Sequence, residues 1–263
     1  MNAPGERRIH PTAVVDPAAS LADDVEIGPY AVIGPDVEIG PGTRIGAHTV
    51  ITGHTRIGAG NRIYHFSSIG EAPQDKKYGG EPTRLEIGDN NTIREFCTLN
   101  RGTVQDAGVT RIGNDNWIMA YVHVAHDCHI GSRTIFANNA QLAGHVHIGD
   151  DAILGGFTLV HQFCRVGAHS ITGLGTVVLL DVPPYVKASG NPVHPYGLNT
   201  EGLRRRGFSA DALSALKRAY RTLYRAGLTL EEARDALGEQ AANSPDVRAL
   251  LEFVSAPGRG FIR

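Results

Sequence analysis

The stretch VEIGPYAVIGPDVEIGPGTRIGAHTVITGHTRIG, residues 25–58, carries an aliphatic residue at every sixth position. Ile27, Ile33 and Ile39 begin the series, and a glycine directly follows most of its members. Helices repeat every 3.6 residues and strands every two, so neither explains this period. A period of six predicts short extended segments that each bury one side chain and then turn. Three such segments make one 18-residue coil of a triangular parallel β-solenoid.

The repeat runs from Ile9 to Val178 with two interruptions. Residues 71–84 are polar and rich in Gly and Pro, and the phase slips by one across residues 101–109. We expect both segments to be loops that leave the coil, and long insertions in a compact array are more often functional than accidental. We expect DVPPYV (181–186) to close the array, because consecutive prolines cannot donate hydrogen bonds to a further rung.

The C-terminal part has a different pattern. Helical spacing relates Leu213, Leu216, Tyr220, Leu223 and Tyr224. Thr229 and Glu232 form a capping-box pattern, and Ser244 precedes a proline at the first position of a further helix. The sequence therefore predicts an all-β solenoid domain over residues 1–190 and a small α-helical domain over residues 191–263.

The whole-chain composition is typical of a cytoplasmic enzyme. The chain has 263 residues, a net charge of −2, 41% apolar and 20% charged residues. Cys97, Cys128 and Cys164 show no paired spacing, which favours free thiols in a reducing compartment. The sequence contains neither a signal-peptide pattern nor an apolar run of about 18 residues. We therefore expect no secretion, no membrane insertion and no nucleic-acid partner.

Histidines gather in the second half of the repeat. Seven of the twelve lie within 47 residues: His123, His126, His129, His145, His147, His161 and His169. Residues 18 apart in such a solenoid lie one above another, about 4.8 Å apart. His126, Gly144 and Gln162 form one such column, and His145 and His161 lie one residue from it. We expect a groove with acid-base capacity along this edge.

Asp127 directly follows His126. A carboxylate beside an imidazole fixes its tautomer and raises its basicity, as a general base requires. Neighbouring residues in an extended segment point to opposite sides, so this contact requires a turn at that position.

Several motifs together resemble the bacterial UDP-N-acetylglucosamine acyltransferases over nearly the whole chain. Besides the hexapeptide array they are PQDKKYGGEPT (73–83), NRGT (100–103), HVAHDC (123–128), LAGHV (142–146), VHQFC (160–164), DVPPYV (181–186) and EGLRRRGF (201–208).

This resemblance implies transfer of an (R)-3-hydroxyacyl group from acyl carrier protein to the glucosamine 3-hydroxyl of UDP-N-acetylglucosamine, the first step of lipid A synthesis. It also implies a left-handed parallel β-helix, an exception to the usual right-handed crossover. The implied assembly is a homotrimer with sites between subunits. No cofactor or metal is implied, because the acyl donor is carried on the phosphopantetheine of acyl carrier protein.

Residue by residue, the resemblance makes His126 the general base, Asp127 its orienting carboxylate and the Gly144 N–H the oxyanion donor. The matching substrate-binding residues are Asp75, Lys77, His123, His145, His161, Gln162, Asn199, Glu201 and Arg205. Leu174 matches the acyl-length determinant, where extra bulk predicts a chain of about ten to twelve carbons.

The charge pattern suggests where an acidic carrier protein would dock. The candidate basic residues are Arg204, Arg206, Lys217, Arg218, Arg221 and Arg225. Without the resemblance, residues 204–206 read as the solvated start of a helix.

Other functions use the same solenoid. A zinc-dependent lyase of the γ-carbonic anhydrase type would use His123, His126 and His129, which are spaced by three. A structural solenoid would need neither the broken phase nor the clustered imidazoles. An acetyl-CoA-dependent acetyltransferase is disfavoured by the loop motifs. A related enzyme that acylates the amine of UDP-glucosamine carries an additional N-terminal domain, for which a repeat starting at Ile9 leaves no room.

Overall fold

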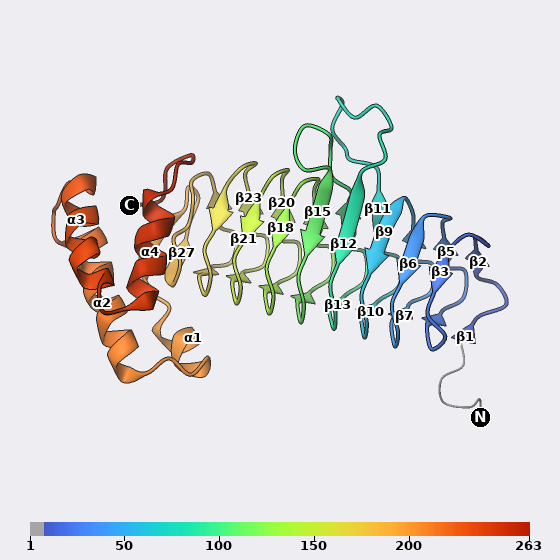
Figure 1. The fold of residues 1–263 in the computed structure, drawn as a ribbon, viewed down its shortest axis with the longest axis horizontal. Helices are drawn as coiled ribbons and strands as arrows, with labels where there is room; N and C mark the ends of the chain where they lie inside the picture. The colour runs from blue at the N-terminus through green and yellow to red at the C-terminus, as the bar shows by residue number, and fades with distance from the viewer. Residues whose placement is uncertain (1–7) are drawn as a thin grey trace.

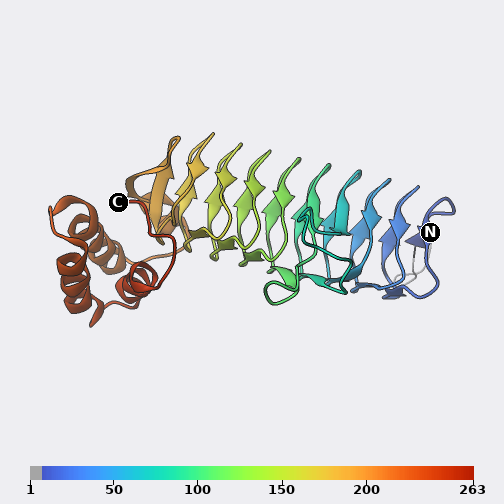
Figure 2. The ribbon, with the colours of Figure 1, turned by 90° about the horizontal axis from the view of Figure 1, so that it is seen from above.

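The structure, a computed structural model, describes residues 8–263. Residues 1–7, which include the start of the expected first domain and the place of a signal peptide, lie outside the described residues. The chain forms a long coil of short strands with a group of helices at its C-terminal end (Figure 1). Successive coils stack along one axis (Figure 2). The predicted β-solenoid with C-terminal helices is confirmed.

Each coil contributes one strand to each of three sheets. The first sheet contains β1 (Arg8–Ile9), β4 (Glu26–Ile27), β7 (Arg44–Ile45), β10 (Arg62–Ile63), β13 (Thr92–Ile93), β16 (Trp117–Ile118), β19 (Ile135–Phe136), β22 (Ile153–Leu154), β25 (Ile171–Thr172), β27 (Val186–Ser189) and β28 (His194–Leu198). The second contains β2 (Val14–Val15), β5 (Val32–Ile33), β8 (Val50–Ile51), β11 (Ser68–Glu71), β14 (Thr98–Asn100), β17 (His123–Val124), β20 (Gln141–Leu142), β23 (Leu159–Val160) and β26 (Val177–Val178). The third contains β3 (Ser20–Leu21), β6 (Val37–Ile39), β9 (His54–Ile57), β12 (Arg84–Ile87), β15 (Val109–Ile112), β18 (His129–Ile130), β21 (His147–Ile148) and β24 (Arg165–Val166).

The strand register confirms the predicted coil and both loops. Ile45 pairs with Ile63, its equivalent one regular coil further along the chain. Ile63 pairs with Ile93, and Ile93 pairs with Ile118, so both of these coils are longer than the regular one. The extra residues form the two loops, at 72–83 and 101–108, between strands of the second and third sheets.

The aliphatic repeat fills the inside of the prism. Ile33, Ile51, Ile69 and Leu99 are all less than 2% exposed, and burying one such side chain contributes about 1.5–3 kcal/mol. Ile9 is 39% exposed because its strand β1 is at the end of the first sheet and pairs only with β4. The core therefore depends on stacking, as the repeat predicts.

The prediction that DVPPYV ends the array was wrong by one coil. Val182 bridges Val166 in parallel, and β27 pairs in parallel with β25. The two prolines fit because they lie in the turn, while the N–H groups of Val182 and Tyr185 donate to the preceding coil. The sheet ends only at β28, which runs back antiparallel to β27.

The predicted helices are present, together with a short one that the sequence did not predict. They are α1 (Thr200–Arg205), α2 (Ala210–Arg225), α3 (Leu230–Ala241) and α4 (Pro245–Ser255). Ser209, Thr229 and Ser244 cap the last three, and the Thr229–Glu232 capping box is formed. The boundary expected between residues 190 and 191 falls in the turn between β27 and β28, so strand precedes helix in the second part. The division into two domains stays a prediction.

Residues 204–206, which without the resemblance read as the solvated start of a helix, lie at the end of one. Asn199 caps α1, so Arg204 and Arg205 occupy its last turn and Arg206 is its C-cap. No helix within residues 8–263 has the length and apolar character needed to cross a bilayer.

The three cysteines are buried free thiols, as predicted. Burial raises the pKa of Cys97 to about 11, that of Cys128 to about 12 and that of Cys164 to about 11. A thiol with so high a pKa is a poor nucleophile at neutral pH. The cysteines therefore act as small apolar residues in this core.

Candidate active site

The candidate site lies at the corner between the second and third sheets, which we call the site corner (residues 125–128, 143–146 and 161–164 with the two loops). Asp127, His145 and Phe163 hold equivalent places in three successive coils, each with a positive φ of 58–65°. The loops leave the two preceding coils at the same corner and project on one side of the molecule (Figure 1). The insertions therefore lie directly beside the clustered histidines.

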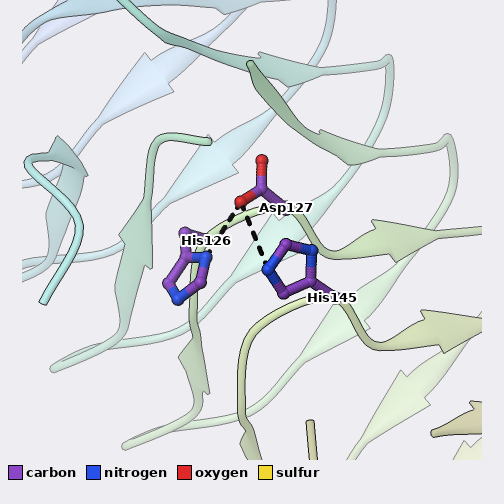
Figure 3. Close-up of side chains that lie close together, drawn as sticks. All are labelled: His126, Asp127 and His145. Carbon is purple, nitrogen blue, oxygen red and sulfur yellow. Dashed lines mark hydrogen bonds and ion pairs between the residues drawn. The ribbon is translucent and has the colours of Figure 1, made fainter. Parts of the chain in front are cut away.

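His126 and Asp127 form a hydrogen-bonded pair (Figure 3). The Nδ1 of His126 lies 2.9 Å from the Oδ2 of Asp127. The left-handed backbone at Asp127 supplies the turn that brings the two neighbouring side chains together. Since an ionised carboxylate only accepts, Nδ1 carries the hydrogen and the Nε2 lone pair remains available as a base.

Thr103 fixes the buried carboxylate of Asp127. Its backbone N–H and its hydroxyl donate to the two carboxylate oxygens over 2.8 and 2.6 Å. Burial opposes ionisation of Asp127, but the hydrogen bonds from His126 and Thr103 outweigh it and lower its pKa. Thr103 belongs to the NRGT motif, to which the sequence analysis assigned no role.

Gly144 lies one coil above His126, against its ring. A Cβ at Gly144 would lie 2.5 Å from Cε1 and 2.6 Å from Nε2 of His126. The glycine is therefore required for the imidazole to occupy its place, a reason that the sequence analysis did not foresee. Gly144 is buried, and within residues 8–263 its N–H donates to no backbone or side-chain acceptor.

A cavity of about 660 Å³ opens beside His126. The predicted residues Asp75, Lys77, His145 and Gln162 line it together with His126. The remaining lining residues are Gln74, Lys76, Gln105, Asp106 and Phe163. Both loops thus contribute walls to one cavity.

The first loop is held by the last residue of β14 and by the residue that follows it. Arg101 donates to the carbonyl of Gly70 over 2.7 Å and to the Tyr78 hydroxyl over 3.0 Å. The Asn100 amide donates to the carbonyl of Ala72 over 3.0 Å. These contacts position the segment that carries Asp75.

His145 lies between two carboxylates. Its Nδ1 is 3.0 Å from the Oδ2 of Asp106, and its Nε2 is 3.8 Å from the Oδ2 of Asp127. The ring stacks on Phe163 and meets the His126 ring edge-on, with centroids 4.4 and 5.1 Å apart. The role of Asp106 could not be predicted from the sequence, because only the fold of the second loop brings its carboxylate to His145.

His123 lies in β17 of the second sheet and His161 directly follows β23, and neither histidine lines this cavity. They line an adjacent, mostly apolar hollow of about 350 Å³ whose wall also includes Ala143. Thr98 Oγ1 lies 2.7 Å from His123 Nδ1, and burial, reinforced by the charge of His126, lowers the pKa of His123. Because Ala143 lines the hollow and His145 lines the cavity, Gly144 stands between the two.

Comparison with known proteins identifies the family. A family model described as UDP-N-acetylglucosamine O-acyltransferase, domain 2, matches residues 181–262, and a bacterial transferase hexapeptide model matches residues 18–53 and 110–144. An acyl-[acyl-carrier-protein]--UDP-N-acetylglucosamine O-acyltransferase of Thiobacillus denitrificans is 69% identical, over 97% of this chain and 99% of that protein. The chain belongs to the UDP-N-acetylglucosamine O-acyltransferase family.

Solved structures of this acyltransferase family have the same fold. The enzyme from Moraxella catarrhalis is 49% identical with a TM-score of 0.95, covering 97% of this chain and 99% of that one. The enzyme from Francisella novicida is 43% identical with the same TM-score, covering 97% and 94%. The left-handed parallel β-helix that the resemblance implied is confirmed.

Asn199, Glu201 and Arg205, which the resemblance predicts to bind substrate, do not line this cavity within one chain. They lie in and beside α1, at the C-terminal end of the coil, whereas the loops leave the coil near its middle (Figure 1). The Asn199 amide accepts from Gly202 N–H and donates to the carbonyl of His169. Glu201 pairs with Arg204.

Leu174 and the basic residues proposed for docking lie outside the cavity. Leu174 is 78% exposed, and its Cδ1 lies beside Gly156, the residue 18 positions before it and therefore one coil away. Leu174 does not line the apolar hollow.

Among the proposed docking residues, Arg206 forms an ion pair with Asp151 at 3.1 Å, whereas those on α2 are exposed.

The alternative zinc-lyase triad does not assemble. His123 lies on the second sheet, His126 at the site corner and His129 on the third sheet, stacked on His147 with centroids 4.8 Å apart. The three rings therefore do not converge on one point.

Proposed function

We infer that this chain transfers an (R)-3-hydroxyacyl group from acyl carrier protein to the 3-hydroxyl of UDP-N-acetylglucosamine, the reaction that begins lipid A synthesis. Membership of the family supports the reaction. The single structural observation that carries it is the His126–Asp127 pair at the wall of a two-loop cavity. The reaction requires no cofactor on the protein, because the donor's phosphopantetheine carries the acyl group.

In the proposed mechanism His126 is the general base. Its Nε2 takes the proton of the sugar hydroxyl as the oxygen attacks the thioester carbonyl carbon. The C–S bond then breaks, and the same proton passes to the leaving sulfur. Asp127 holds the tautomer that makes Nε2 a base. General base catalysis of this kind contributes about 10²–10⁴ in rate.

We assign the oxyanion donor to the N–H of Gly144. Its place between the cavity and the apolar hollow supports this role, because the thioester carbon must lie where sugar and acyl chain meet. Its N–H has no acceptor among residues 8–263. One such donor is worth about 3 kcal/mol at the transition state.

We place the sugar in the cavity and the acyl chain along the hollow. Asp75, Lys77, His145 and Gln162 offer polar groups to the sugar. The hollow offers an apolar surface formed by the second sheet, with His123 and His161 at its edge. The chemistry of the two walls therefore matches the two halves of the product.

The distribution of apolar residues supports a homotrimer. Most exposed large apolar side chains lie on the first and second sheets and at the corner between them, and among residues 8–263 none lies on a strand of the third sheet. The exceptions, Val104, Phe163, Leu179 and Leu180, follow strands of the second sheet, on the side of the candidate site. The third sheet instead presents side chains such as Glu38, Arg56, Glu86 and Arg111. We propose that neighbouring subunits cover the first two sheets and leave the third in solvent.

A trimer would also complete the site. Asn199, Glu201 and Arg205 lie far from His126 within one chain, so we propose that a neighbouring subunit's α1 brings them to the nucleotide. A guanidinium suits a diphosphate. The exposed basic face of α2, with Lys217, Arg218, Arg221 and Arg225, would receive the acidic carrier protein. The cytoplasmic location stays a prediction.

The decisive experiment measures acyl transfer from 3-hydroxyacyl carrier proteins of graded chain length to UDP-N-acetylglucosamine. We expect transfer by the wild type and a loss of at least about 100-fold in His126→Ala. Absence of transfer at every chain length would refute the function. Transfer that survives in the variant would refute the role of His126.

A further inference from the structure

The oxygen Oδ2 of Asp127 faces nitrogen atoms of two different imidazoles (Figure 3). It lies 2.9 Å from the Nδ1 of His126 and 3.8 Å from the Nε2 of His145. The three atoms all lie within 4.8 Å of one another. Within residues 8–263 no other three histidine, cysteine or carboxylate side chains bring such atoms together.

Asp106 determines which nitrogen of His145 points at this oxygen without a hydrogen. Its carboxylate lies 3.0 Å from Nδ1 and can only accept, so Nδ1 of the neutral ring carries the hydrogen. The Nε2 lone pair then faces the Asp127 carboxylate, acceptor against acceptor. A cation between these two atoms satisfies both. A carboxylate on the far nitrogen of a ligating histidine is also the usual outer shell of a protein zinc site.

The surroundings fit a divalent ion. Asp106 and Asp127 supply two negative charges, and both imidazoles can be neutral ligands. Thr103 holds the Asp127 carboxylate in place. The side chains of His126 and His145 are 16% and 13% exposed, and both line the cavity, which leaves room for a fourth ligand such as water.

We propose that His126 Nδ1, Asp127 Oδ2 and His145 Nε2 bind a divalent transition metal of the zinc class, and that binding switches the enzyme off. The metal occupies the Nδ1 lone pair of His126, so the ring hydrogen moves through solvent from Nδ1 to Nε2. The nitrogen that serves as the base then carries a hydrogen and cannot accept one from the sugar. The inhibitory half of this proposal rests on the proposed function, whereas the binding half does not.

The binding half is tested by titrating Co²⁺ into the purified full-length protein and following its visible absorption. We expect one Co²⁺ per chain, with the bands of a four- or five-coordinate site, and its displacement by Zn²⁺. His145→Gln should abolish the bands, and Asp106→Asn should weaken binding about 10- to 100-fold. His147→Gln is the matched control, because this histidine stacks on His129 outside the group, and it should bind as the wild type does. Absence of uptake, or a loss confined to His147→Gln, overturns the site.

The inhibitory half is tested by acyl transfer at increasing Zn²⁺. Inhibition should follow the occupancy measured with the wild type, and its midpoint should rise in Asp106→Asn by the same factor as the dissociation constant. Binding without inhibition overturns the switch. A chain that transfers no acyl group would refute the proposed function, and the Co²⁺ titration would still decide the metal site.

Discussion

At the scale of single residues, the ring of His126 occupies the space that a side chain at position 144 would need. The sequence shows that a glycine belongs one coil above the base, but only the structure shows that the imidazole needs this space. Gly144→Ala should therefore push the ring off its hydrogen bond with Asp127 and lower kcat about 100-fold or more, in the range that a general base contributes. Steady-state kinetics would measure this loss.

The control for Gly144→Ala is Gly34→Ala. Gly34 lies next to β5, and a Cβ there meets its neighbours at 3.4 Å or more. This variant should retain wild-type rates. Equal kcat values for Gly144→Ala and the wild type would show that the ring has room elsewhere and that the close approach does not matter.

A second residue-scale prediction concerns Leu174. Its side chain is 78% exposed on one chain and stands at the corner of the first and second sheets, beside Gly156. If the acyl chain extends along the second sheet toward this corner, the leucine limits its length. Leu174→Gly should then shift the preferred donor to a longer acyl chain. Competition between donors of 10 to 16 carbons would measure the shift, and an unchanged preference would remove Leu174 from the acyl site.

At the scale of elements, the first loop is fixed by a side chain from the next coil. Arg101 holds Gly70 and Tyr78, so Arg101→Ala should release the segment that carries Asp75 and Lys77. We expect the KM for UDP-N-acetylglucosamine to rise about tenfold, with a smaller change in kcat, since losing positioned binding contacts acts on both ground and transition state. Faster tryptic cleavage after Lys76 or Lys77 would show the release directly. Tyr78→Phe removes the contact of Arg101 with the Tyr78 hydroxyl and the donation of that hydroxyl to the Glu81 carbonyl. It keeps the contact of Arg101 with Gly70, so it should have a smaller effect on both measurements.

The junction between the coil and α1 should be sensitive to pH. Burial lowers the pKa of His169, and Arg206 and Arg133 add to this, while Asp151 and Asp246 oppose it. The unfolded chain, with a histidine pKa near 6.5, therefore takes up the proton first as the pH falls. The contribution of the neutral His169 ring to the free energy of unfolding is complete above about pH 6.5. It is lost as the pH falls toward the pKa of His169 in the folded protein.

The measurement compares urea midpoints at pH 7.5 and 5.5. The wild type should lose more stability than His169→Gln over this interval. The variant should keep part of the dependence, because burial also lowers the pKa of His123 and His147. Equal losses in the two proteins would show that His169 contributes nothing to the junction's pH dependence.

At the scale of elements, some features can be predicted from the sequence and others cannot. The period of six predicted the strands, the register and both loops, because each inward aliphatic is a local requirement of the coil. The sequence did not predict that Pro183 and Pro184 fit within a further coil, since this depends on which N–H groups the turn leaves unpaired. Nor did it predict the contact of Asp106 with His145, because the two are far apart in the chain and the path of the second loop decides it. Local sequence patterns thus predicted the β-helix and the His126–Asp127 pair. The rest of the site depends on contacts between loop residues and residues far from them in the sequence.

At the scale of the whole molecule, one corner of the prism carries a ladder of exposed rings. Tyr30, His48, Phe66, Phe96 and Tyr121 stack in sequence with centroids 4.9–5.4 Å apart. The ladder separates the first and second sheets, the two faces that we assign to subunit contacts. Phe96→Asp with Tyr121→Asp should therefore dissociate the proposed trimer, because two charges would be buried without partners. Sedimentation velocity would detect the monomer, and an intact trimer would place the contacts on other faces.

A trimer with shared sites makes a prediction that no single-chain site can mimic. His126→Ala removes the base from one side of every interface, and Arg205→Ala removes the nucleotide contact from the other, so each variant alone should be nearly inactive. Mixed trimers can be formed by unfolding and refolding the two variants together in equal amounts. In such a trimer a site is intact when an Arg205→Ala subunit supplies the base and the neighbouring His126→Ala subunit supplies the arginine. Random mixing around a three-fold ring gives this arrangement in about a quarter of the sites. Recovery of about a quarter of wild-type transfer would place the site between subunits. If the mixture stays as inactive as its components, His126 and Arg205 serve the same chain, and α1 has to reach the site corner by a movement within one subunit.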